Sequence, residues 1–336
     1  MRCSSVFLNG VSSVLGDRIE HPPGGPGGLS RRDLRALDIE SVRVSNNSGP
    51  QLAIEAGKRT LSLSGKSPSS VGGLLHANTY YQGHDMWSPA SFVQDGLRIN
   101  GGITAEVRQV SAGALVALDV ACRYVQCEPS RTILITTGDT FRDGFARWTS
   151  DPGTAYGDAG TAALVASSGL LQLLSISVFG DPSLEAMHRD QVHHGRTNSP
   201  RMVDLGDRQR RFIASHRREA IGARLRAGLA SAHRDALTDA GLDTSDISWF
   251  VLPNFGARRM RSTFFGPLDI PPSKSLWRWG RTVGHLGAGD QLAGLAHLVD
   301  CGRLSEGDYI ELIAVGAGFT WASVVIQFLP ESSNAI

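Results

Sequence analysis

The chain has 336 residues, of which 41% are hydrophobic and 19% are charged, as is usual for a globular protein with a sizeable core. Its net charge of +1 gives no electrostatic reason to expect nucleic acid or a membrane surface as a partner. The four cysteines lack metal-type spacing, and no uninterrupted apolar run could span a bilayer. We therefore expect a cytoplasmic protein with reduced thiols and no metal site.

The first half of the chain alternates strands with helices. A buried strand that begins near residue 4 is expected to end at Gly10, and a Gly- and Pro-rich surface loop is expected over 19–30. Periodicity and apolar runs then predict a helix over 48–65, a strand over 71–80, a helix over 111–126 and a strand over 131–140.

The second half repeats this order. The expected elements are a strand over 170–180, one or two Arg-rich helices over 207–241, a strand over 246–256, a helix over 289–302 and two strands joined by a glycine turn over 307–328. Alternation of this kind predicts an α/β architecture with mostly parallel sheets.

Three segments carry a resemblance to a known family. Val110-Ser111-Ala112-Gly113 opens an apolar helix, AYGDAGTAALVAS covers 155–167, and AVGAGFTWASVVIQF covers 314–328. They resemble the A-C-x-G run, the F-G-D-G-A-A-A strand and the A-F-G-G-G-x-x-W motif of ketoacyl synthase III, the priming member of the thiolase superfamily. With the order of elements, this resemblance covers nearly the whole chain.

The resemblance implies a thiolase-type α/β fold, in which two similar halves form a five-layered αβαβα core. The N-terminal half, 1–170, would carry the nucleophile. The C-terminal half, 171–336, would carry the base and the oxyanion loop. The family also implies a homodimer that needs no cofactor, because its substrates are acyl thioesters of carrier-protein phosphopantetheine or coenzyme A.

All three catalytic positions of the family differ in this chain. The nucleophilic cysteine is replaced by Ser111, the histidine of P-H-Q-A-N by Asn254, and the asparagine of G-N-T-S-A by His285. A serine hydroxyl needs an adjacent general base, and a histidine base needs an orienting carboxylate. His285 and Asp290, five positions later, are the candidates for these roles.

These changes predict acyl transfer in place of carbon–carbon condensation. The acyl or aroyl group would pass from the thioester to Ser111 and then to a hydroxyl or amine of a small-molecule acceptor. Serine-containing members that resemble this chain occur in antibiotic pathways, and some acylate a sugar or aminocyclitol. Two alternatives stay open: a starter-unit ketosynthase that still forms a carbon–carbon bond, and a non-catalytic docking subunit.

Further site residues follow from the family geometry. The oxyanion would be held by the backbone N–H groups of Ser111 and Ala317, and the substrate would be contacted by Asn254 and Phe255. Arg259 matches the family's carrier-protein docking arginine, and its neighbours Arg258 and Arg261, with the Arg-rich helix over 208–218, could extend a patch for the acidic acyl carrier protein.

Each of these residues also has a simpler interpretation. Ser111 and Asp290 are residue types that cap helices, Asn254 suits a loop, and arginine runs are usually solvated. His193-His194 does not predict a metal site, because adjacent histidines point apart on most backbones. Four tryptophans could line an acyl tunnel, although packing is their default role: Trp148, Trp277, Trp279 and Trp321.

Overall fold

A computed structural model describes residues 1–24, 29–142, 144–189 and 202–329. Nine strands in the described chain form one mixed sheet in the order β5-β4-β6-β7-β1-β8-β11-β10-β9. Their bounds are β1 Phe7–Leu15, β4 Gly73–Ala77, β5 Ile103–Val107, β6 Ile133–Asp139, β7 Ala159–Ala166, β8 Leu171–Gly180, β9 Trp249–Val251, β10 Tyr309–Gly316 and β11 Thr320–Phe328. A separate hairpin pairs β2 Arg18–Glu20 with β3 Val42–Val44.

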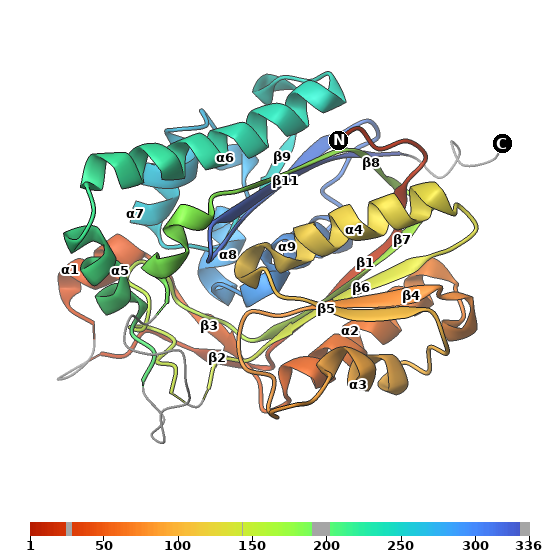
Figure 1. The fold of residues 1–336 in the computed structure, drawn as a ribbon, viewed down its shortest axis with the longest axis horizontal. Helices are drawn as coiled ribbons and strands as arrows, with labels where there is room; N and C mark the ends of the chain where they lie inside the picture. Colours follow the sequence, from red (N-terminus) through yellow and green to blue (C-terminus); the bar gives the residue numbers. More distant parts are fainter. Residues whose placement is uncertain (25–28, 143, 190–201, 330–336) are drawn as a thin grey trace.

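Helices cover both faces of this sheet and fill the space between its two parts (Figure 1). The α-helices of the described chain are α1 Arg31–Leu37, α2 Gly49–Ser64, α3 Pro89–Gly96, α4 Gly113–Cys127, α5 Leu205–Ala214, α6 Arg218–Ala240, α7 Ala257–Met260, α8 Trp277–Val283 and α9 Asp290–Asp300. Helix α2 packs on β1, β6 and β7, α3 adjoins α2, and α6 packs on β8 and β11. Helices α4 and α9 lie between the two parts of the sheet.

The layers are therefore α2/α3, the strands from β5 to β1, α4/α9, the strands from β8 to β9, and α6. This is the predicted five-layered thiolase-type α/β fold, and the prediction of fold class is confirmed. The division of the chain into halves at residue 170 stays a prediction.

Two expectations about the strands are wrong. The sheet is not mostly parallel, because only β4–β5, β4–β6 and β9–β10 are parallel among its eight neighbouring pairs. A tight hairpin joins β10 to β11, and a long segment returns the chain from β6 to β7, so both of these pairs are antiparallel. The first strand also does not end at Gly10, because β1 passes through an irregularity between Leu8 and Val11 and continues to Leu15.

The segment that contains α4 resembles a membrane span in its length and apolar composition. The segment Val110–Cys127 is long and apolar enough, by length and composition alone, to cross a membrane. Half of it is buried inside the protein, where Leu115 and Leu118 of α4 are fully inaccessible. We interpret α4 as the core helix of the fold, and its N-terminal end carries Ser111.

Candidate active site

Ser111 lies in a 3₁₀ turn, Val110–Ala112, that leads into α4. The preceding residue, Val110, has a φ of +50°, a conformation that a β-branched side chain rarely adopts and that costs on the order of 1–3 kcal/mol. This turn is tight, and Ser111 lines a cavity, with its Oγ 2.8 Å from His285 Nε2. The two residues are 174 positions apart in the sequence.

His285 follows α8 and is held by its backbone and by two aromatic rings. Its N–H donates to the Ala155 carbonyl at 2.8 Å, and its carbonyl accepts from the N–H of Gly157 at 2.9 Å. The imidazole makes edge contacts with the rings of Tyr156 and Phe255, at centroid distances of 5.0 and 5.2 Å. His285 is 1% exposed, so the protein and not the solvent sets the orientation of its imidazole.

Asp290, the first residue of α9, hydrogen-bonds to Nδ1 of His285 through Oδ2. The same oxygen accepts from the backbone N–H of Asn254 at 2.9 Å, and Oδ1 accepts from the N–H of Leu286 at 2.7 Å. A carboxylate that accepts a hydrogen bond from Nδ1–H fixes the imidazole tautomer, which leaves Nε2 free to accept the serine proton. The three predicted residues thus form one hydrogen-bonded line.

The capping interpretations do not hold for these residues. The N-cap of α4 is Ala112 and that of α9 is Gly289, and neither Ser111 nor Asp290 accepts from the first turn of its helix. Their side-chain oxygens bond instead to His285, Leu286 and Asn254.

Asn254 is not where the family geometry implied. We expected it to contact the substrate, but its side-chain amide donates to Asp290 Oδ1 and to the Gly284 carbonyl, both at 3.0 Å. Both amide hydrogens are used, the residue is 4% exposed, and it does not line the cavity. Asn254 therefore positions Asp290. Phe255, predicted beside it, does line the cavity and touches the His285 ring.

The predicted oxyanion donors lie at the base of the same cavity. Ser111 and Ala317 both line it, and neither backbone N–H has a hydrogen-bond acceptor among the described residues. Gly316 brings the two loops together, because a Cβ at this position would lie 2.2 Å from the carbonyl oxygen of Gln109. Only glycine allows the strand end to approach the Ser111 turn this closely.

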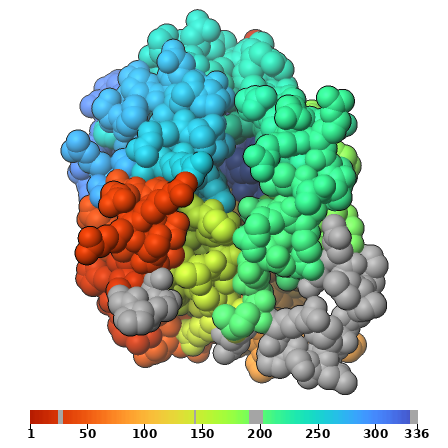
Figure 2. All heavy atoms as spheres, turned by 90° about the vertical axis from the view of Figure 1, so that its left-hand side faces the viewer, coloured from red at the N-terminus to blue at the C-terminus, as the bar shows by residue number. Residues whose placement is uncertain are grey.

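The cavity has a volume of about 600 Å³, which suits a small organic substrate. Its mouth opens between α6 and the segment from α7 to Leu268, and Figure 2 shows this hollow with the C-terminal strands, in dark blue, at its bottom. Its lining includes apolar side chains: Leu225, Leu229, Leu268, Val315, Phe319 and Trp321. It also includes polar side chains: Thr79, Asp151, Tyr156, His188, Gln209 and Arg259.

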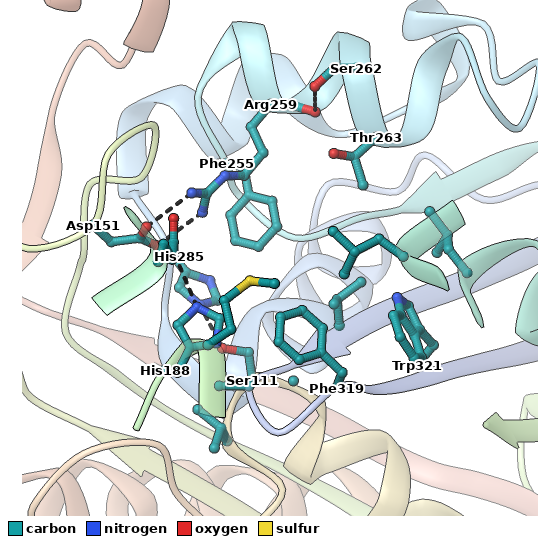
Figure 3. Close-up of a pocket in the computed structure, with 18 of the residues that line it drawn as sticks. Ser111, Asp151, His188, Phe255, Arg259, Ser262, Thr263, His285, Phe319 and Trp321 are labelled. Atoms are coloured by element: carbon teal, nitrogen blue, oxygen red, sulfur yellow. Dashed lines mark hydrogen bonds and ion pairs between the residues drawn. The ribbon is translucent and has the colours of Figure 1, made fainter. Parts of the chain in front are cut away.

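Arg259 is not free to dock a carrier protein. Its guanidinium forms two hydrogen bonds to Asp151, both 2.9 Å, and others to Thr154 Oγ1 and the Pro152 carbonyl at 2.6 and 2.7 Å. Burial alone would raise the pKa of the Asp151 carboxyl, but the charge and hydrogen bonds of Arg259 outweigh it and hold that pKa at about 2. Both residues of this ion pair line the cavity (Figure 3). Arg258 and Arg261 are exposed beside it.

A second carboxylate lies under the loop that carries His285. Asp139 is inaccessible and accepts the backbone N–H groups of Thr79, Tyr80 and Ala288 at 2.8 to 3.0 Å. Burial raises its pKa to about 6, although these hydrogen bonds oppose the shift. Asp139 joins the end of β4 to the turn between His285 and α9.

Sequence reasoning missed several cavity residues. Tyr156 lies inside the matched segment 155–167, so the motif could have indicated it. Asp151, His188, Gln209 and Thr79 carry no sequence signal, because distant segments bring them together.

The remaining candidates are less informative. Of the four tryptophans only Trp321 lines the cavity, while Trp148 hydrogen-bonds to Glu20, Trp279 stacks on His297, and Trp277 contacts Phe265. His193 and His194 lie outside the described residues. Within the described ranges, no group of three or more His, Cys, Asp or Glu side chains could hold a metal ion.

Family models agree with this geometry. Residues 105–181 match the model of 3-oxoacyl-[acyl-carrier-protein] synthase III, and residues 237–328 match the model of its C-terminal part. Together these stretches span half of the chain and include Ser111, His285 and Asp290. The chain belongs to the family of enzymes like 3-oxoacyl-[acyl-carrier-protein] synthase III, within the thiolase superfamily.

Individual relatives support this assignment. The β-ketoacyl-[acyl-carrier-protein] synthase III of Roseiflexus castenholzii is 29% identical over 283 residues, which is 82% of each chain. The solved structure of the acyltransferase ChlB3 superposes with a TM-score of 0.89 at 26% identity, covering 98% of this chain and 99% of that one. The synthase III of Aquifex aeolicus VF5, at 19% identity, shows the same fold with a TM-score of 0.75 and covers 96% of this chain and 100% of its own. Enzymes of this family are transferases that use acyl thioesters of acyl carrier protein or coenzyme A and need no bound cofactor.

Proposed function

We propose that this protein is an acyltransferase that moves an acyl or aroyl group from a thioester, through an acyl ester of Ser111, to a hydroxyl or amine of a small natural-product acceptor. The observation that carries the proposal is the 2.8 Å contact between Ser111 Oγ and His285 Nε2, continued from Nδ1 to Asp290. A serine nucleophile needs such a base, whereas a cysteine at a helix end does not.

The first half-reaction acylates the serine. Ser111 Oγ attacks the thioester carbonyl while its proton passes to His285 Nε2, and the N–H groups of Ser111 and Ala317 hold the oxyanion. The tetrahedral intermediate then expels the thiolate of the donor, which leaves with the proton from the imidazolium. Asp290 stabilises the imidazolium, because the carboxylate has four hydrogen-bond donors around it and less than 2% exposure.

The second half-reaction runs the same path with the acceptor. An acceptor hydroxyl or amine gives its proton to His285 Nε2 and attacks the ester carbonyl. The bond to Ser111 Oγ breaks, and the serine recovers the proton. ChlB3, itself an acyltransferase, superposes with a higher TM-score (0.89) than the synthase III of Aquifex aeolicus VF5 (0.75), which supports acyl transfer as the activity. Antibiotic biosynthesis is the setting that we propose.

The condensing alternative is less well supported. Condensation uses two groups on the carbonyl of the incoming thioester, and this chain offers His285 and Asn254 at the corresponding positions. Both amide hydrogens of Asn254 already bond to Asp290 and Gly284, and its side chain does not reach the cavity. A docking subunit without activity would have no need for a buried, fully hydrogen-bonded His285–Asp290 pair.

We propose that the donor arrives on an acyl carrier protein, with its phosphopantetheine entering beside α6. Arg226 lines the cavity, is exposed and has no ion-pair partner among the described residues. Arg258 and Arg261 are exposed next to Arg259 and Ser262, which line the cavity. These cations replace Arg259 in the docking role. We also propose a cytoplasmic homodimer, supported by β5, which is an open edge of the sheet.

Intact-mass spectrometry tests the proposal. Wild-type protein incubated with acetyl- or benzoyl-coenzyme A should gain one acyl group, and the Ser111→Ala variant should gain none. An adduct that survives Ser111→Ala would eliminate the serine mechanism. Incubation with malonyl carrier protein should release no carbon dioxide, and appreciable release would favour the ketosynthase alternative.

A further inference from the structure

The ion pair of Arg259 and Asp151 is connected to both aromatic rings that contact His285. The Tyr156 hydroxyl donates to Asp151 Oδ2 at 3.0 Å, and the guanidinium carbon of Arg259 lies 5.1 Å from the centroid of the Phe255 ring. These two rings make the edge contacts with the His285 imidazole, at 5.0 and 5.2 Å. One ion pair therefore holds both rings that touch the base.

The hydrogen bonds of Arg259 fix its guanidinium in one place. Its two terminal nitrogens each donate to one oxygen of Asp151 at 2.9 Å, and they also donate to Thr154 Oγ1 and to the Pro152 carbonyl. A planar guanidinium matches a carboxylate in this two-bond arrangement, and it cannot rotate without losing several bonds. The Asp151 side chain is 6% exposed, so water competes little for them.

Tyr156 also connects this ion pair to the backbone of His285. The two residues form an isolated parallel bridge, in which the His285 N–H donates to the Ala155 carbonyl and the Gly157 N–H donates to the His285 carbonyl. A hydrogen bond from Nδ1 fixes the tautomer of the ring, but the ring can still tilt about that bond. The rings beside it limit this tilt, and the tilt sets the distance from Nε2 to Ser111.

We propose that Arg259 and Asp151 are positioning residues for the base: through Phe255 and Tyr156 they hold the His285 imidazole where it can accept the proton of Ser111. In the view of Figure 3, His285 lies between this ion pair and Ser111. This role replaces the carrier-protein docking that the family resemblance implied for Arg259. The inference rests on the proposed function, because it takes His285 as the base of Ser111.

A docking cation and a positioning cation predict different kinetics for Arg259→Lys, which keeps the charge but loses the two-bond fork. We expect the limiting rate of Ser111 acylation to fall roughly 10- to 100-fold, because a displacement of about 1 Å in an active site costs up to this much. The factor should be the same for benzoyl-coenzyme A and for the benzoyl thioester of N-acetylcysteamine, with little change in KM. Stopped-flow detection of the released thiol measures both parameters.

Tyr156→Phe tests the same connection without removing a charge. The variant keeps the ring and the ion pair but lacks the hydroxyl that donates to Asp151. Acylation by both thioesters should slow roughly three- to tenfold, the value of one hydrogen bond. A wild-type rate in Tyr156→Phe would overturn the proposal. A raised KM for benzoyl-coenzyme A alone in Arg259→Lys, with a normal limiting rate, would overturn it too and return Arg259 to donor binding.

Arg281→Lys is the matched control. The Arg281 side chain is 24% exposed against 25% for Arg259, pairs with Asp38 at 2.8 Å and lies over the Trp277 ring at 5.3 Å, but it does not line the cavity. Its loss should leave acylation within about twofold of wild type, less than the value of one hydrogen bond. An equal loss of rate in Arg281→Lys would show a general effect on the fold and would contradict a positioning role.

Proton NMR of the unacylated protein tests the position of the ring without catalysis. The Nδ1–H of His285 donates to the buried Asp290, so it should give a slowly exchanging downfield signal that is missing in His285→Ala. We expect this signal to broaden or vanish in Arg259→Lys and to persist in Arg281→Lys. An unchanged signal in Arg259→Lys would contradict the proposal. If the signal behaves as expected but wild-type protein forms no acyl-enzyme, the positioning role is supported and the proposed function is wrong.

Discussion

Asn254 donates two hydrogen bonds to Asp290, one from its backbone N–H to Oδ2 at 2.9 Å and one from its side-chain amide to Oδ1 at 3.0 Å. Position 254 carries a catalytic histidine in the family. Here Asn254 instead holds Asp290, the carboxylate that orients His285. Relative to the family, histidine and asparagine have changed places between positions 254 and 285. The two substitutions depend on each other, because a base at position 285 needs Asp290 as its partner and Asn254 holds Asp290 in place.

Replacement of this amide tests the positioning role. Asn254→Ala should lower kcat about 10- to 100-fold with an unchanged KM for the donor, and should lower the unfolding free energy by about 1–3 kcal/mol, because a buried carboxylate loses a donor. Asn78→Ala is the control, since Asn78 is also buried but bonds to Glu106. A raised donor KM with normal kcat would return Asn254 to substrate binding.

A second variant reaches the same contact from the other side. A Cβ at Gly280 would lie 2.4 Å from Oδ1 of Asn254, so Gly280→Ala should displace the amide and reproduce the kinetic loss. An unaffected Gly280→Ala enzyme would mean that the amide is not needed where it lies.

Replacement of the Asp290 carboxylate should lower activity more than replacement of Asn254. Asp290→Asn should slow acylation of Ser111 by about 10³- to 10⁴-fold, because an amide favours the wrong tautomer of His285. The circular dichroism spectrum should remain that of the wild type. Stopped-flow release of coenzyme A measures the step, and an active Asp290→Asn enzyme would exclude the aspartate from catalysis.

Arg226, which has no ion-pair partner among the described residues, should act on the donor alone. Arg226→Ala should raise KM for an acyl-coenzyme A about fivefold, with little change for the N-acetylcysteamine thioester, which has no phosphate. The effect should shrink as salt is added. Arg224→Ala is a matched control on the same helix, because Arg224 pairs with Asp181. Equal KM changes for both thioesters would argue against a phosphate contact.

Asp139 should give the fold an unusual pH dependence. Its pKa rises from 3.8 to about 6 on folding, so the folded chain binds the extra proton and this group lowers stability as pH increases from about 4 to 6. Wild type should therefore lose on the order of 2–3 kcal/mol relative to Asp139→Asn between pH 4 and pH 7. Urea unfolding at both pH values measures this difference, and a constant difference would contradict it.

Much of the fold could be predicted because local signals agree with the tertiary structure. Helix α2 has the capping box of Ser48 and Gln51 and ends at Gly65 in the left-handed conformation, so its bounds follow from sequence. Ser111, His285 and Asp290 could be brought together because each lies in or beside a motif whose place in the family fold is known. The directions of the strands could not be predicted from the sequence, because the antiparallel pairing of β6 with β7 depends on a long connecting segment.

The errors at the site share a physical cause. Arg259 and Asn254 were assigned from their places in the sequence, but their hydrogen bonds are made with Asp151 and Asp290, which are 108 and 36 positions away. A guanidinium or amide near a buried carboxylate bonds to it, whatever role the position has in a relative. Thr79 and His188 were missed because segments that are far apart in the sequence bring them to the cavity.

The contact between Ser111 and His285 also allows acylation of Ser111 to be used as a measure of folding. Ser111 precedes α4 and His285 follows α8, 174 positions later. No local segment can form the pair, so the contact has high contact order. A folding intermediate with only one part of the sheet complete would hold an inert serine. The rate at which refolding protein becomes able to take up an acyl group would therefore time the docking of the two parts, with a mass shift at one residue as the signal.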